Sequence, residues 1–118
     1  MTATLSKDGR YRYDLHRGDP RGRNVLFTML NPSVADADQD DPTIRKCRGF
    51  CERWSFDGFW VANLFAYRAT DPRDLWRAER DGIDIVGPLN NEYIGLCALR
   101  CEEHVAAWGA QADNPAGR

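Results

Sequence analysis

Residues 25–30, Val25-Leu26-Phe27-Thr28-Met29-Leu30, are almost continuously apolar, and the run stops abruptly at Asn31-Pro32-Ser33. A short apolar run without alternation predicts a strand that is covered on both faces, as in a parallel sheet. The same pattern predicts a second buried strand over residues 59–65, from Phe59 to Phe65, and a shorter third strand over residues 105–109, from Val105 to Gly109.

Helices are predicted between these strands. Asp41-Pro42 is typical of a helix start, with Asp as the cap and Pro at the first helical position, and Asp71-Pro72 repeats the signal. We expect the first helix to end before Asp57 and the second at about Glu79, and a longer helix to open at Gly87-Pro88. Apolar stripes at helical spacing predict the inner faces, namely Ile44, Cys47, Phe50, Cys51 and Trp54 in the first helix and Leu89, Tyr93, Leu96, Cys97 and Cys101 in the last.

The N-terminal segment has a different period. Tyr11, Tyr13 and Leu15 alternate with Arg12 and Asp14, which predicts an edge strand that belongs to a hairpin. From residue 25 onward, strands alternate with helices, and this order implies right-handed crossovers. The predicted fold is therefore one α/β domain over residues 1–109, a three-layer sandwich with a mostly parallel sheet and an N-terminal antiparallel edge strand or hairpin. Residues 110–118 are predicted to form an irregular tail.

Length and composition exclude several classes of protein. The chain has 118 residues, 42% hydrophobic and 29% charged, with a net charge of -2, so we expect one globular domain and not a polybasic protein. The N-terminus has no hydrophobic signal region and no apolar run is long enough to span a bilayer, which predicts a cytoplasmic chain without a membrane partner. The H-E-x-x-H, phosphate-loop and G-x-G-x-x-G motifs are missing from the sequence, so zinc protease, P-loop and dinucleotide chemistry are disfavoured, and no cofactor is predicted.

Ligands of parallel sheets bind beyond the carboxyl ends of the strands, where Asn31, Asn63 and Gly109 are expected to lie. The Asn31 amide could orient a water or a substrate carbonyl, or it could simply start a turn. The Asn63 amide could read the edge of a base, or it could bond to neighbouring backbone. Arg68 offers a planar fork for phosphate and Tyr67 a ring for stacking. Alternatively, Arg68 pairs with Asp71 or Asp41 and Tyr67 covers the core.

A cluster of acidic residues and two pairs of cysteines have several possible functions. The loop after the first strand carries four acidic residues, Asp36, Asp38, Asp40 and Asp41. Its carboxylates could hold Mg²⁺ or Ca²⁺, or Asp36 or Asp40 could act as a general base beside Asn31. Alternatively, the loop is solvated and supplies only one helix cap. Two i, i+4 cysteine pairs, Cys47/Cys51 and Cys97/Cys101, could converge on zinc or an iron–sulfur cluster, but both pairs lie on apolar stripes, which favours packing in the core. The basic N-terminal segment could follow a phosphate backbone or protect an edge strand.

Five ordered motifs between Tyr11 and Gly109 resemble the domain of unknown function 1643 family. The motifs are Met29-Leu30-Asn31-Pro32-Ser33, Asp41-Pro42-Thr43-Ile44-Arg45, the run from Asn63 to Pro72, Gly87-Pro88-Leu89-Asn90-Asn91 and Ala106-Ala107-Trp108-Gly109. A more distant likeness is to the uracil-DNA glycosylase superfamily, through Asn31-Pro32, Ala62-Asn63 and Trp108-Gly109. Both groups continue into a fourth strand with a His-Pro motif, so the resemblance implies that this chain is truncated and lacks the last strand.

The resemblance and the strand-end residues together predict a glycosylase-like hydrolase that acts on a nucleobase, nucleotide or nucleic acid, or its inactive truncated remnant. The predicted catalytic residues are Asn31 and Asp36. The predicted ligand-binding residues are Pro32, Ser33, Asn63, Tyr67, Arg68, Trp108 and Gly109. DNA or a nucleotide is the expected partner, and no metal is assigned to the site. Two alternatives are a non-catalytic nucleotide- or nucleic-acid-binding module and a structural metal protein built on the cysteines. Substrate identity and oligomeric state are left open.

Overall fold

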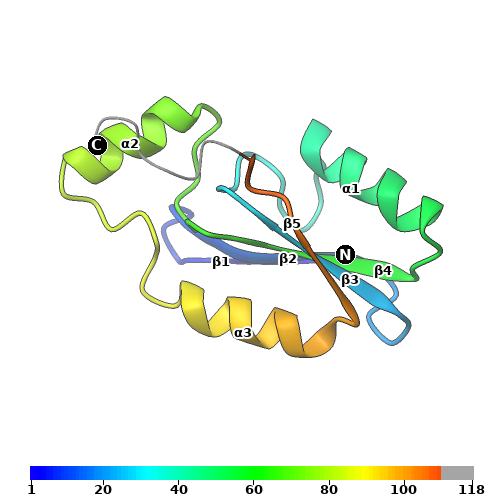
Figure 1. Ribbon diagram of the computed structural model, residues 1–118. Coiled ribbons are helices and arrows are strands. Elements are labelled where there is room, and N and C mark those ends of the chain that lie inside the picture. Colours follow the sequence, from blue (N-terminus) through cyan, green and yellow to red (C-terminus); the bar gives the residue numbers. More distant parts are fainter. Residues whose placement is uncertain (110–118) are drawn as a thin grey trace.

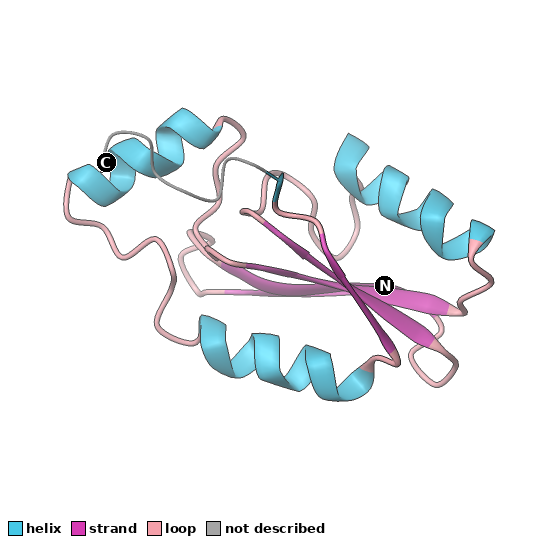
Figure 2. Ribbon diagram, in the orientation of Figure 1, coloured by secondary structure: helices cyan, strands magenta, loops and turns pink. Residues whose placement is uncertain are grey.

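The computed structural model describes residues 1–109 as a small α/β domain with a five-stranded sheet and three helices (Figures 1 and 2). The elements are β1 (Thr2–Leu5), β2 (Arg12–Gly18), β3 (Asn24–Met29), α1 (Pro42–Arg53), β4 (Gly58–Asn63), α2 (Pro72–Arg80), α3 (Asn90–Arg100) and β5 (Glu103–Ala106). The prediction of an irregular tail over residues 110–118 lies outside the described residues. Within residues 1–109, no helix is long and apolar enough to cross a membrane.

The sheet is mixed, so the prediction of a mostly parallel sheet is wrong. The strand order is β1-β2-β4-β3-β5. The pairs β3/β4 and β3/β5 are parallel, as the strand and helix alternation predicted. However, β2 joins the same sheet antiparallel to β4, and β1 pairs antiparallel with β2. The N-terminal hairpin is antiparallel as predicted, and it supplies two of the five strands of the sheet.

The strand expected at the edge is an interior strand. Between β1 and β4, β2 is covered on both faces and buries charged residues, among them Arg12, Asp14 and Arg17. The alternation of Tyr13 and Leu15 with Arg12 and Asp14 indicated one solvated face, but here the polar side chains are enclosed. Polar groups can be buried where they have partners, and the Arg17 guanidinium has several. The edge strand of the hairpin is β1.

Two helix starts are confirmed. The Asp41 carboxylate accepts a hydrogen bond from the Ile44 N–H at 2.9 Å, and Asp71 caps α2 by accepting from the Arg73 N–H. In the predicted inner face of the first helix, Ile44, Cys47 and Cys51 are buried, but Phe50 and Trp54 are exposed. The last helix and strand differ from the prediction. Helix α3 begins at Asn90, with Leu89 and Leu96 exposed, and β5 ends at Ala106.

Helices α1 and α3 cover opposite faces of the sheet, which we call the α1 face and the α3 face (Figure 1). The α1 face holds the larger core, in which Phe27, Phe59 and Val61 pack against α1. Leu26 and Ala62 pack against Cys97 of α3 on the other face. Helix α2 lies beyond the strands and packs on the segments that follow β3 and β4. The segments that follow β3 and β4 therefore cover the carboxyl ends of the parallel strands.

Candidate ligand-binding site

The segments that follow β3 and β4 stay side by side after the strands end. The Leu64 N–H donates to the Met29 carbonyl at 2.8 Å, and the Ala69 N–H donates to the Pro32 carbonyl at 2.9 Å. The Ser33 and Thr70 hydroxyls lie 3.0 Å apart. These bonds hold Ser33 next to residues 67–70, so the two predicted strand-end loops do meet.

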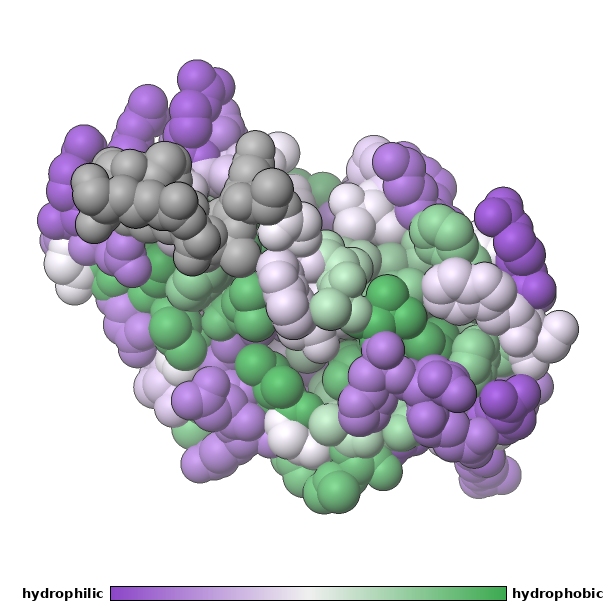
Figure 3. Space-filling model, viewed as in Figure 1, coloured by the Kyte–Doolittle hydropathy of each residue, from purple (hydrophilic) through white to green (hydrophobic). Residues whose placement is uncertain are grey.

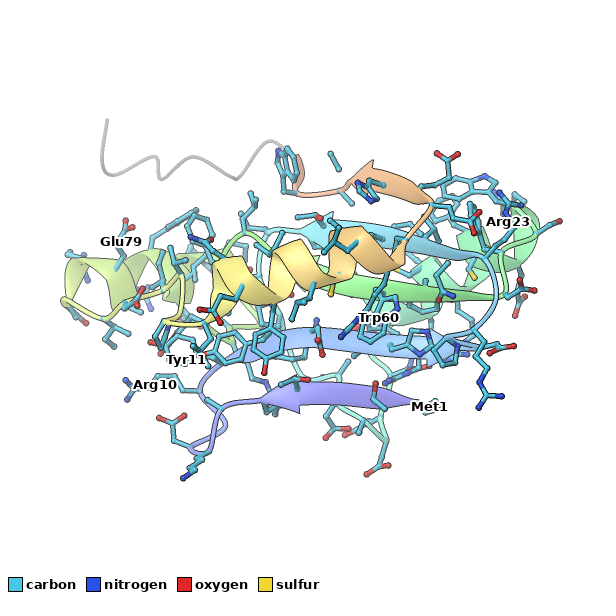
Figure 4. The ribbon with its side chains drawn as sticks, turned by 90° about the horizontal axis from the view of Figure 1, so that it is seen from below. Met1, Arg10, Tyr11, Arg23, Trp60 and Glu79 are labelled. Carbon is cyan, nitrogen blue, oxygen red and sulfur yellow. The ribbon has the colours of Figure 1, made fainter. Side chains whose placement is uncertain are left out.

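A cavity of about 450 Å³ opens between these loops and the β1–β2 hairpin. Its lining contains three of the predicted ligand residues, Ser33, Tyr67 and Arg68. The remaining lining residues are Gly9, Arg10, Val34, Ala69 and Thr70. Arg10 and Tyr11 lie at the α2 end of the molecule (Figure 4). The sequence indicated that the basic N-terminal segment could follow a phosphate backbone, but it did not predict that Gly9 and Arg10 line a cavity together with Arg68.

The Arg68 guanidinium is held entirely by backbone carbonyls. Its Nε donates to Ser33 O at 3.0 Å, Nη1 to Gly9 O at 3.3 Å and Nη2 to Val34 O at 3.3 Å. The expected ion pairs are not formed, because Asp71 binds Arg73 and Asp41 caps α1. No ion pair of the described residues includes Arg68. Its positive charge at the cavity is therefore not neutralised by a direct carboxylate contact.

Tyr67 belongs to a row of tyrosine rings. It meets Tyr11 edge to face at a centroid distance of 6.2 Å, Tyr11 stacks on Tyr13 at 6.1 Å, and Tyr13 stacks on Tyr93 of α3 at 5.1 Å. The row fixes the Tyr67 ring from one side. Tyr67 is half-buried and lines the cavity.

Asn31 and Asn63 do not line this cavity. The Asn31 amide donates to the Ala69 carbonyl at 2.6 Å and to the Pro32 carbonyl at 3.0 Å, so it ties the two loops together. Asn63 is 1% exposed, and strand alternation places it on the α1 face with Phe59 and Val61. Neither polar atom of its side chain has a hydrogen-bond partner. Such a buried orphan amide costs about 1–3 kcal/mol and needs an explanation.

Asp36, the second predicted catalytic residue, has hydrogen-bond partners in its own loop. The Asp36 carboxylate accepts from the N–H groups of Asp38 and Gln39 at 2.9 Å each, and these bonds lower its pKa below the ordinary value. A carboxylate with a lowered pKa is a weak general base. Pro32 is buried beside the loops, whereas Trp108 and Gly109 follow β5 on the other side of β3, and none of the three lines the cavity.

The acidic loop and the cysteines have structural surroundings. Asp40 binds Arg17 and Arg48 through its two carboxylate oxygens, each at 2.8 Å. The cysteine pairs lie on opposite faces of the sheet, Cys47 and Cys51 in α1 and Cys97 in α3 with Cys101 directly after that helix, so the possible four-thiolate centre is wrong. Burial raises the pKa of Cys47 and of Cys97 to about 12. Within residues 1–109, no group of three or more potential ligands is placed to hold a metal ion.

The chain is thus an α/β domain with a polar cavity between loops at the carboxyl edge of its parallel strands. The family model described as "Protein of unknown function (DUF1643)" matches residues 12–118, and the chain belongs to that family. The family resemblance of the five motifs is thereby confirmed. No curated protein and no solved structure matches the chain.

Proposed function

We propose that this protein binds a nucleotide, or the phosphate backbone of a nucleic acid, in the cavity that Arg68 lines. The observation that carries the proposal is the Arg68 guanidinium, which makes no direct contact with a carboxylate of the described residues. Carbonyl bonds occupy three of its five N–H donors, which leaves two for an anion. Arginine binds phosphate through such paired donors.

The other lining residues suit the rest of a nucleotide. The half-buried Tyr67 ring, fixed by Tyr11, offers an aromatic face on which a base can stack. The hydroxyls of Ser33 and Thr70 can exchange their mutual hydrogen bond for bonds to a sugar or phosphate. A cavity of about 450 Å³ falls within the usual range for small-molecule sites.

The alternative is a glycosylase-like hydrolase related to the uracil-DNA glycosylases. One observation favours it, namely the buried Asn63 amide, which has no partner of its own. A substrate base that reached Asn63 would satisfy both the amide N–H and the carbonyl. Against it, the Asn31 Nδ2 and the Asp36 Oδ1 already form hydrogen bonds within the loops, and neither residue lines the cavity. The non-catalytic binding module is therefore the better-supported function.

We expect Arg68→Met to weaken binding of a nucleoside monophosphate by about 30-fold, the loss of one charge-assisted phosphate contact of about 2 kcal/mol. Calorimetric titration of the wild type and the variant with the monophosphate and with the matching nucleoside measures this loss. Arg73→Met is the matched control, because Arg73 is an exposed arginine paired with Asp71 outside the cavity.

Arg68 also donates hydrogen bonds to three backbone carbonyls, so its replacement could destabilise the fold. Thermal melting of each variant therefore separates a loss of binding from a loss of stability. If the nucleoside binds as tightly as the monophosphate, or Arg68→Met binds as tightly as the wild type, the phosphate role is refuted. The same protein incubated with uracil-containing single-stranded DNA tests the alternative. Release of free base that Asn63→Ala abolishes would replace the binding module with the hydrolase.

A further inference from the structure

Strand β5 forms a free edge of the sheet within residues 1–109. It pairs only with β3, at the end of the strand order opposite to β1. Figure 4 shows β1 and β5 at the two sides of the sheet. The Ala107 N–H donates to the Thr28 carbonyl, and peptide groups alternate along a strand, so the N–H groups of His104 and Ala106 face outward. Such an edge is a template for another strand.

An apolar groove of about 310 Å³ runs beside this edge on the α1 face. Phe50 of α1 and Trp54, which directly follows that helix, form one wall, although they are 39% and 43% exposed, and Val105 and Ala107 form the other. On the α3 face, Leu96 and Leu99 are also exposed. Figure 3 shows this side of the molecule, with apolar residues gathered across its middle. Contiguous apolar surface of this kind marks an interaction site.

Charges of opposite sign stand at the two ends of the β5 edge. Glu103 is exposed at the start of the strand and is paired in register with Val25, which places it on the α1 face. Lys46 is exposed and lines the groove with Ala107, just past the other end of the strand. Val105 lies between them, packed against the core of the α1 face. Along the β5 edge, an acidic residue is therefore followed by an apolar residue and then by a basic one.

We propose that two copies of this chain associate by antiparallel pairing of β5 with β5. Side chains on one face must match across the pair, which puts Val105 opposite Val105 of the second copy and Glu103 opposite its Ala107. Each Glu103 then reaches Lys46 of the other copy. Because the two-fold axis is perpendicular to the sheet, both α1 helices lie on the same side of the joined sheet. Phe50 and Trp54 of one copy then cover Phe50 and Trp54 of the other copy. An edge that is acidic at one end and basic at the other is complementary to itself under this symmetry.

Charge reversal tests the pairing by sedimentation of the full 118-residue chain over micromolar to near-millimolar concentrations. The wild type should reach twice the mass of one chain. Lys46→Glu and Glu103→Lys should each raise the dimer dissociation constant about tenfold, because each places like charges together twice. The double variant Lys46→Glu/Glu103→Lys should return to within about threefold of the wild type, since the attraction is restored in reverse.

Lys7→Glu is the matched control, because it changes an exposed lysine in the β1–β2 turn by the same charge. It should leave the dissociation constant unchanged. A wild-type chain that remains one copy at every concentration overturns the proposal. So does a dimer that the single reversals do not weaken, or one that the double reversal fails to restore, since the β5 edge would then not be its interface. Circular dichroism of each variant checks that the substitution, which is at an exposed position, leaves the fold intact.

Discussion

Replacement of Arg17 by methionine is expected to lower the free energy of unfolding by about 3–5 kcal/mol, the usual cost of breaking a buried ion pair from one side. The Arg17 side chain is completely buried. Its Nε donates to the Asp40 carboxylate at 2.8 Å, Nη1 donates to the His16 carbonyl at 3.0 Å, and Nη2 donates to the Asp36 carbonyl. Methionine matches the length of the stem but supplies none of these donors. Urea unfolding followed by tryptophan fluorescence measures the loss.

Arg48→Met is the matched control, because Arg48 binds the other oxygen of the same Asp40 carboxylate, also at 2.8 Å. Its side chain is 38% exposed, so water can replace it, and we expect a cost below about 1 kcal/mol. Both arginines contact one carboxylate at the same distance, so the contrast measures what burial and the additional carbonyl bonds of Arg17 contribute together. Equal small losses from the two substitutions would show that the acidic loop is held by other contacts.

This network also predicts a pH dependence. Burial raises the pKa of Asp40, but the hydrogen bonds from Arg17 and Arg48 outweigh it and leave the pKa below its ordinary value of 3.8. A carboxylate with a lowered folded pKa contributes stability that is present above the unfolded pKa and is lost as pH falls through the folded one. Arg17→Met should therefore flatten the acid side of the stability profile below about pH 4.

Gly18→Ala is expected to lower the free energy of unfolding by about 3 kcal/mol or more, because backbone strain and a steric clash add. Gly18 ends β2 opposite Gly58 of β4, with a φ of +89°. A Cβ there would lie 2.5 Å from the Asp57 carbonyl oxygen and 2.7 Å from the Gly58 Cα. Both are backbone atoms, so β2 and β4 would have to separate. Thermal unfolding followed by circular dichroism measures the loss.

Gly9→Ala separates the two causes. Gly9 also has a positive φ, +71°, but a Cβ there would meet nothing within 4 Å. Only the left-handed backbone penalty remains, about 1–2 kcal/mol. If Gly9→Ala and Gly18→Ala unfold at the same temperature, the close approach of β2 to β4 does not constrain this position.

The parts of the site that the sequence could reveal are those that follow a strand directly. Ser33 and Arg68 follow the two apolar runs, and parallel strands bring such positions to one edge, so both could be placed near a ligand. Asn31 has the same location, but its amide points back to Ala69, a residue 38 positions away. No local pattern distinguishes an amide that ties two loops from one that faces a ligand.

The sequence by itself determined the Asp-Pro helix starts, the buried strands β3 and β4 and the family, because each depends on residues within a few positions of one another. Only the tertiary structure decided that β2 lies inside a mixed sheet and that the hairpin completes the cavity. The Nη1 of Arg68 contacts the Gly9 carbonyl across 59 residues of chain. Such a contact depends on how the whole sheet closes and leaves no periodicity in the residues that make it.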